Sequence, residues 1–187
     1  KFTFNLPLEE IYDYTVFEFS FSFWQWGFDP ASIPSKKASP NDMFNYLIKV
    51  CSPDYFAREG IEGHQAFYVQ AAKELGYYGY DTKPFAKYLV VKSAENYLQQ
   101  LFLPENTTFT FDTSLAMKCQ RFLENNDPTM IFVYGGWDPW SAAAVQFEGK
   151  QRMYRAVAPT GSHAARIRSL PDDIRKQVTD RLDLWLK

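Results

Sequence analysis

Two residues that can share a proton, an aspartate and a histidine, each follow a strand candidate in the second half of the chain. Asp138 comes just after residues 130–134, which are all apolar or aromatic, and His163 follows a second strand candidate at residues 153–157. An uncharged apolar run that ends at glycine is typical of a strand buried on both faces of a parallel sheet. Because functional groups gather at the carboxyl ends of parallel strands, we expect Asp138 and His163 to lie close together.

Proton transfer is the chemistry that such a pair supports. A carboxylate beside an imidazole holds the ring in one tautomer and stabilises its charged form. The ring can then act as general base toward a nucleophile and as general acid toward a leaving group. Each residue also has a structural interpretation: Asp138 as the N-cap of a helix that begins at Pro139, and His163 as a capping or surface histidine.

The residues around this pair resemble a known family. Tyr-Gly-Gly-Trp-Asp-Pro-Trp-Ser at 134–141 and Gly-Ser-His at 161–163 are similar to secreted bacterial tripeptidyl aminopeptidases, which are relatives of the prolyl aminopeptidases. Phe-Ser-Phe-Trp-Gln-Trp-Gly at 21–27 and Glu-Leu-Gly-Tyr-Tyr-Gly-Tyr-Asp at 74–81 resemble the inserted cap of that family. The resemblance covers nearly the whole chain. It implies an α/β-hydrolase fold, whose triad runs in the order Ser, Asp, His, with Asp138 and His163 as its last two members.

The serine of such a triad is missing. No Gly-x-Ser-x-Gly occurs in the sequence, Ser162 is the immediate neighbour of His163, and Ser141 lies at a helix start. We therefore expect this chain to be the C-terminal fragment of a serine aminopeptidase and to be inactive alone. Two strands leave unpaired backbone groups, so we expect the missing N-terminal half of the same protein, or self-association, to cover them.

The resemblance also implies a peptide substrate with a free N-terminus, whose protonated amine calls for carboxylates in the cap. The candidates are Glu18, Glu74 and Asp81, each with a solvated surface acid as the alternative. Trp137 and Trp140, on either side of Asp138 and Pro139, are either walls of a substrate pocket or core residues, and the same two roles are open for the tryptophans of Trp24-Gln25-Trp26. No metal or organic cofactor is implied, and the family resemblance places the protein outside the cell or in the periplasm.

Composition restricts the possible partners. A net charge of −2 gives no long-range attraction for phosphate backbones, so nucleic acid is disfavoured. No uncharged apolar run reaches the roughly 18 residues of a membrane span. With only two histidines and two cysteines, a zinc site is not expected. Whether Cys51 and Cys119 pair is open, and the 18 % aromatic content fits either an aromatic core or a stacking cleft.

The order of elements predicts the fold class, an α/β chain that forms the helix-rich C-terminal half of an α/β-hydrolase. Residues 1–110 are expected to form a helical cap, and residues 111–187 the last two parallel strands and the terminal helix of the core. Residues 19–23 also alternate as in a strand, but the length of the apolar segment favours a helix. Residues 107–111 fit a small strand or an extended connection. The expected helices span 6–26, 39–50, 64–75, 84–102, 112–125 and 171–186.

Two other functions are compatible with these patterns. An esterase or lipase has the same acid–histidine tail, but paired acids in the cap that bind an amine would argue against it. A helical binding module that has lost its enzyme is the second alternative. An open strand edge at 130–134, or an Asp138 too distant from His163 to bond, would favour that module.

Overall fold

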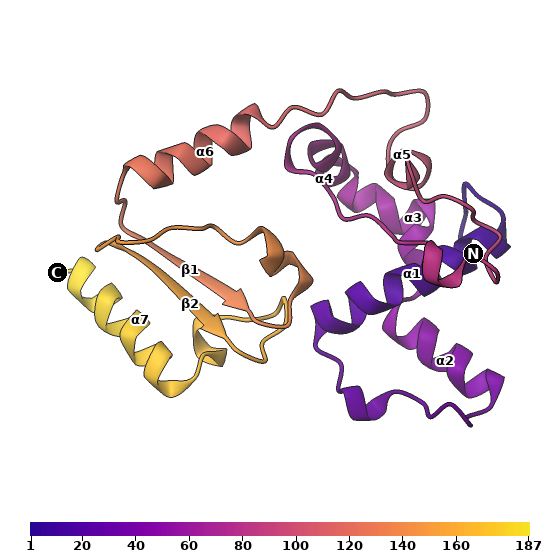
Figure 1. Ribbon diagram of the computed structural model, residues 1–187, viewed down its shortest axis with the longest axis horizontal. Coiled ribbons are helices and arrows are strands. Elements are labelled where there is room, and N and C mark those ends of the chain that lie inside the picture. Colours follow the sequence, from indigo (N-terminus) through magenta and orange to yellow (C-terminus); the bar gives the residue numbers. More distant parts are fainter. The chain divides into compact units, whose positions relative to one another are not determined.

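A computed structural model describes residues 1–187, which fold as two compact units. The first unit comprises residues 1–20 and 33–117, and the second comprises residues 21–32 and 118–187. Packing, and not sequence order, defines these units, because the end of the first helix folds with residues that come far later in the chain. Figure 1 labels the elements of both units along the chain.

Helix α1 (Leu8–Trp26) is the longest element and contributes to both units. It begins directly after Pro7, and Glu9 and Glu10 occupy its first turn, where the helix dipole favours anions. The helical prediction for this segment is confirmed, and the strand alternative at residues 19–23 is wrong. Gly27, with φ of +72°, ends the helix in the left-handed conformation that glycine adopts without steric cost.

The first unit packs helices around an aromatic core. Helix α2 (Pro40–Val50) is capped by Ser39, whose hydroxyl accepts a hydrogen bond from the Asp42 amide at 3.1 Å. Three shorter helices follow: α3 (Arg58–Ile61), α4 (Gln65–Gln70), which runs into a π-helical turn (Ala71–Leu75), and α5 (Tyr97–Leu101). Gly76 closes the turn as expected. The largest fully buried side chains here are Tyr14, Phe56, Phe102, Ile11 and Leu101.

A continuous helix over residues 84–102 is not present, and this prediction was wrong. Only a 3₁₀ turn (Lys83–Phe85) and α5 are helical in this range. The buried Asp13 carboxylate accepts hydrogen bonds from the Val90 and Val91 amides, at 2.7 and 2.9 Å. These two amides therefore cannot donate to backbone carbonyls, as a helix would require. Asn96, with φ of +61°, breaks the helical path again just before α5.

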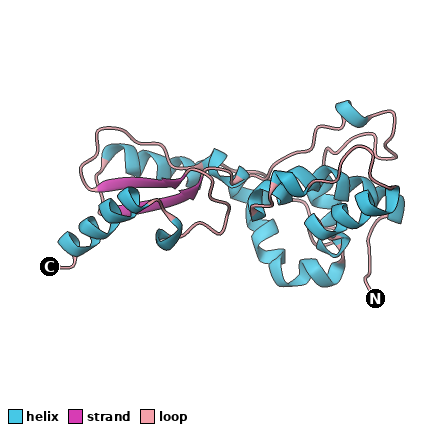
Figure 2. Ribbon diagram, turned by 90° about the horizontal axis from the view of Figure 1, so that it is seen from below, coloured by secondary structure: helices cyan, strands magenta, loops and turns pink.

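The second unit is built on two parallel strands, β1 (Met130–Gly135) and β2 (Met153–Ala158), which Figure 2 shows in magenta. Helix α6 (Ser114–Asn125) leads into β1, and helix α7 (Asp172–Trp185) follows β2. The pairing begins at Met130 opposite Met153 and ends at Gly135 opposite Ala158. The predicted fold class, a helix-rich α/β chain with two parallel strands, is confirmed.

One face of the strand pair packs against α7. The apolar cluster on this face includes Ile131, Val133, Ala156, Ala158, Leu170, Ile174, Val178 and Leu182. The other face of β1 is covered by a short loop, with Phe132 against Phe147 and the Tyr134 hydroxyl accepting from the Val145 amide at 3.0 Å. The expectation that β1 is buried on both faces is wrong for this chain, since Met130 is 41 % exposed and only Gly135 is fully buried.

Residues 107–111 form an irregular connection and not a strand. Cys51 is buried in the first unit, Cys119 is exposed on α6, and both are free thiols. None of the helices combines the length and the apolar character that crossing a membrane requires.

Candidate active site

Asp138 and His163 are hydrogen-bonded to each other in the second unit. His163 Nδ1 lies 2.8 Å from Asp138 Oδ2. Because a carboxylate only accepts, Nδ1 is the nitrogen that carries the proton, and Nε2 is the basic nitrogen of the neutral ring. The Asp138 side chain is 8 % exposed and the His163 side chain 48 % exposed. The acid is therefore enclosed, and the imidazole presents its other edge to the surroundings.

The turn after β1 brings Asp138 to this position. A Cβ added at Gly135 would lie 2.2 Å from the Ser162 carbonyl oxygen, and one added at Gly136 would lie 2.3 Å from that of Pro159. The two glycines therefore let the histidine loop cross directly over the end of β1. The Trp137 amide donates to the Gly161 carbonyl at 2.9 Å, which ties the two loops together one residue before Asp138.

The second carboxylate oxygen of Asp138 caps the next helix. Oδ1 accepts from the Trp140 amide at 3.1 Å at the start of a 3₁₀ helix (Pro139–Ala143). The capping interpretation and the pairing with His163 therefore both apply to Asp138, through different oxygens. The Ser141 hydroxyl donates to the Gly135 carbonyl at 2.8 Å and supports this turn.

The end of α1 contacts the histidine loop from the other side. The His163 amide donates to the Gln25 carbonyl at 2.8 Å, and the Trp26 and His163 rings meet edge to face with centroids 6.1 Å apart. Sequence reasoning did not find these contacts. The only signal was the Trp-Gln-Trp-Gly motif itself, because nothing in the sequence connects position 26 to position 163.

Of the predicted aromatic wall, Trp137 is the more exposed member. The residue is 38 % exposed, and its ring meets that of Trp24 edge to face, with centroids 5.4 Å apart. Trp140 is half-buried and follows Asp138 in the capped turn. Trp137 directly precedes Asp138, and Trp140 follows it by two residues. Trp137 forms an exposed aromatic surface with Trp24.

Glu18 differs from the other two predicted cap acids because it is buried, with only 2 % exposure. Its carboxylate accepts a hydrogen bond from the Tyr80 hydroxyl at 2.6 Å and from the Tyr78 hydroxyl at 2.9 Å. Burial and the nearby Glu18 charge raise the pKa of both phenols well above the usual value, so they remain protonated donors. Burial also raises the pKa of Tyr77, to about 12. Glu18 is therefore a buried carboxylate held by neutral donors.

Glu74 and Asp81 lie in different surroundings. Glu74 is half-buried in the π-helical turn before Gly76, and its carboxylate makes no hydrogen bond or ion pair. Asp81 is exposed and accepts from the Lys83 amide at 3.0 Å, as a turn aspartate does. The other histidine of the chain, His64, is exposed, with Nδ1 3.4 Å from the Gly60 carbonyl. Only Glu18 combines burial with several hydroxyl donors.

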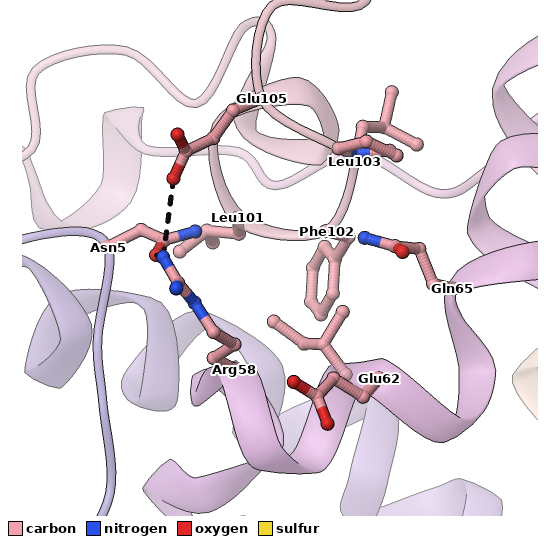
Figure 3. Close-up of a pocket in the computed structure, with 10 residues that line it drawn as sticks. Asn5, Arg58, Glu62, Gln65, Leu101, Phe102, Leu103 and Glu105 are labelled. Carbon is pink, nitrogen blue, oxygen red and sulfur yellow. Dashed lines mark hydrogen bonds and ion pairs between the residues drawn. The ribbon is translucent and has the colours of Figure 1, made fainter.

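A pocket of about 320 Å³ opens within the first unit, and none of the predicted site residues lines it (Figure 3). Arg58 at its wall is paired with Glu105 at 3.3 Å. Nowhere in the chain do three His, Cys, Asp or Glu side chains gather where they could hold a metal ion. The lining residues are Asn5, Arg58, Ile61, Glu62, Gln65, Leu101, Phe102, Leu103, Pro104 and Glu105.

An acid after one parallel strand, hydrogen-bonded to a histidine after the next, is the arrangement of the C-terminal part of an α/β-hydrolase. Comparison with known proteins assigns the family within that class. The chain belongs to the PS-10 peptidase S37 family, whose model matches residues 2–187. No solved structure matches it significantly.

A curated relative is the prolyl tri/tetrapeptidyl aminopeptidase of Streptomyces mobaraensis. It is 28 % identical to this chain over 187 aligned residues, which cover 95 % of this chain and 38 % of the relative. The chain therefore spans less than half the length of the curated relative that it matches. Together, the family and the relative support a peptidase function.

Proposed function

We propose that this chain supplies the acid and the base of a serine aminopeptidase that releases short peptides from free N-termini. The observation that carries the proposal is the 2.8 Å hydrogen bond between His163 Nδ1 and the enclosed Asp138 carboxylate. A base held in this way keeps Nε2 available for a proton. Membership in a peptidase family, and the aminopeptidase activity named for a relative, support the choice of reaction.

In the proposed reaction, His163 Nε2 takes the proton of a serine hydroxyl as the serine oxygen attacks the scissile carbonyl. The imidazolium then gives this proton to the leaving amine, and an acyl-serine ester remains. His163 next activates a water molecule, which hydrolyses the ester and restores the serine. Asp138 stays ionised throughout and stabilises the imidazolium in both steps. The serine would come from the N-terminal half of the same protein, which would also add strands next to β1 and β2.

We propose that Glu18 binds the protonated N-terminal amine of the peptide substrate. An ammonium group that leaves water needs a carboxylate partner, and of the three predicted acids Glu18 is the one that is buried and already oriented by two phenols. Trp137 and Trp140 would contact the substrate near the scissile bond. We further propose that the enzyme acts outside the cell or in the periplasm, as the family resemblance implies.

The proposed roles of Asp138 and His163 are tested in the complete enzyme with Asp138→Asn. This change keeps the size of the side chain and the accepting oxygen of the Trp140 cap but removes the charge beside the imidazole. We expect kcat to fall by about 10⁴-fold with little change in the thermal unfolding midpoint, because the pair acts through charge and tautomer and not through packing. The measurement is hydrolysis of a chromogenic peptide amide with a free N-terminus.

Asp81→Asn is the matched control, since it makes the same chemical change at an exposed turn aspartate. If Asp138→Asn retains activity similar to that of the control, Asp138 is not a member of the triad and the serine peptidase proposal fails. An activated ester adds a second criterion. A burst of product from the unmodified enzyme, absent in Asp138→Asn, is expected for an acyl-serine intermediate.

A further inference from the structure

The imidazole of His163 needs more than one hydrogen bond to stay in place. Its side chain is 48 % exposed, and it lies on a loop between β2 and the 3₁₀ turn Ile167–Ser169. A half-exposed side chain on a loop has several rotamers within reach, and only one of them points Nδ1 at Asp138. The surroundings of the loop therefore decide how much of the time the pair is formed.

The last turn of α1 contacts the histidine loop in three ways. The His163 amide donates to the Gln25 carbonyl at 2.8 Å, and the Trp26 indole meets the imidazole at an interplanar angle of 81°. A Cβ added at Gly27 would lie 3.0 Å from the Ser162 Cβ, so the backbone just after α1 approaches the residue that precedes the histidine. The backbone hydrogen bond, the ring contact and the close approach at Gly27 all involve residues 162 and 163.

The same turn also reaches the loop that carries the acid. Trp24 meets Trp137 edge to face, with centroids 5.4 Å apart and an interplanar angle of 76°. Trp137 directly precedes Asp138. The end of α1 thus contacts both loops of the pair, the acid loop through Trp24 and the histidine loop through Gln25 and Trp26.

The end of a helix is suited to holding a neighbouring loop through its backbone. The last four carbonyls of an α-helix have no partner within the helix, and the Gln25 carbonyl obtains one from the His163 amide. Trp26 is 57 % exposed, so core packing does not explain its contact with the imidazole. Edge-to-face packing of aromatic rings has a preferred geometry, which restricts the rotation of the smaller ring.

We propose that the last turn of α1, residues 24–26, together with Gly27 just after it, positions the Asp138–His163 pair, and that Trp26 is the positioning residue that holds the imidazole toward Asp138. This inference rests on the proposed function, because it assigns Trp26 a role in the same proton transfer. Trp26 touches neither the scissile bond nor the serine in this scheme and acts only through His163.

The test compares Trp26→Leu, which removes the ring but keeps an apolar side chain, with Trp26→Phe, which keeps a ring, in the complete enzyme. For Trp26→Leu we expect kcat to fall about 10- to 100-fold, because a small misplacement of a catalytic group has effects of this size, while KM changes by less than about twofold. Trp26→Phe should recover most of the loss. Trp185→Leu, the same change on α7 of the same unit, is the matched control and should leave both parameters unchanged.

A spectroscopic readout separates positioning from general loss of structure. With ¹⁵N-labelled histidine, the Nδ1 proton of His163 should give a low-field resonance in the unmodified enzyme, assigned by its absence in His163→Gln. The resonance should weaken or disappear in Trp26→Leu and return in Trp26→Phe. Circular dichroism should show the same fold for every variant.

The outcomes distinguish this inference from the proposed function. If Asp138→Asn abolishes turnover while Trp26→Leu retains the kcat and the resonance of the unmodified enzyme, the positioning role is rejected and the proposed function stands. A raised KM at constant kcat in Trp26→Leu also rejects it, because Trp26 would then be a substrate contact. If Asp138→Asn remains fully active, the proposed function itself fails, whatever the behaviour of Trp26.

Discussion

At the scale of single residues, burial separates the acids that the sequence presents as equivalent. Asp138 divides its two oxygens between an imidazole and a helix cap. In Glu18, Oε2 accepts from both the Tyr78 and Tyr80 hydroxyls, and Oε1 also accepts from Tyr78. Asp81 and Glu74 have neither arrangement. A carboxylate withdrawn from water needs donors for its charge, and those donors are what make it a fixed and usable partner for a cation.

The role proposed for Glu18 predicts a selective loss in Glu18→Gln. The amide fills the same space and can bond both tyrosines, but it offers no charge to an ammonium group. We expect KM for a free-amine peptide to rise about 10- to 100-fold, which corresponds to the loss of one hydrogen bond to a charged group. Hydrolysis of the N-acetylated peptide, slow in the unmodified enzyme, should not change.

Glu74→Gln is the control for this experiment, and it should leave both substrates unaffected. Equal losses for the free and the acetylated peptide in Glu18→Gln would indicate a structural role for the buried carboxylate. Equal rates for the two peptides in the unmodified enzyme would contradict the aminopeptidase proposal and favour an esterase or an endopeptidase.

At the scale of elements, the pair depends on a close crossing of two loops at the ends of β1 and β2. Gly135 and Gly136 are required because backbone atoms of the histidine loop occupy the space of their missing side chains. The turn then continues into the 3₁₀ helix that Asp138 caps. Strand β1, the turn at Gly135 and Gly136, and the 3₁₀ helix together direct Asp138 Oδ2 toward His163.

Gly135→Ala should disrupt this crossing. The new Cβ would meet the carbonyls of Gly161 and Ser162 at 2.5 and 2.2 Å, and these are backbone atoms that cannot simply rotate away. We expect a loss of about 1–3 kcal/mol in the free energy of unfolding, as for other overpacked sites, and a larger relative loss in kcat. Denaturant unfolding and peptide hydrolysis measure the two effects.

Gly63→Ala is the matched control, because no atom lies within 4 Å of a Cβ at that position. Its stability and turnover should remain close to those of the unmodified protein. A Gly135→Ala enzyme as stable and as active as Gly63→Ala would show that the histidine loop is not held against the end of β1.

At the scale of the whole molecule, the sheet has only two strands, and the strand edges of such a small sheet remain open. Strands β1 and β2 pair with each other, so each has an outer edge whose N–H and C=O groups have no strand partner, and Met130 is exposed at the start of β1. Edges of this kind associate with other chains unless they are covered. The chain aligns with only 38 % of its curated relative.

We therefore predict that the 187-residue chain, expressed alone, neither reacts with a serine-directed fluorophosphonate nor behaves as a simple monomer. Light scattering should show species larger than 21.8 kDa, and addition of the N-terminal half should restore both labelling and turnover. A monomer that is labelled stoichiometrically would overturn this prediction. It would mean that Ser141 or Ser162 is a nucleophile, although the Ser141 hydroxyl is bonded to the Gly135 carbonyl.

The sequence by itself determined the parts of this protein that depend on local pattern. An uncharged apolar run stopped by glycine predicted β1, and the segment 153–157 before Pro159 predicted β2. Pro7 and the glutamates after it predicted the start of α1, and the order of elements predicted the pairing of Asp138 with His163. These features are encoded by neighbours along the chain, because caps, periodicity and turn residues act over a few positions.

Only the tertiary structure decided the features that join distant positions. The predicted helix at 84–102 is absent because the carboxylate of Asp13, which lies far away in the sequence, takes its amides. Glu18 differs from Glu74 and Asp81 because two tyrosines, 60 and 62 residues away in the sequence, donate hydrogen bonds to its carboxylate. Trp26 was found at His163 because the end of α1 folds with the second unit. Contacts between residues so far apart leave no periodicity in the sequence, and only packing brings them together.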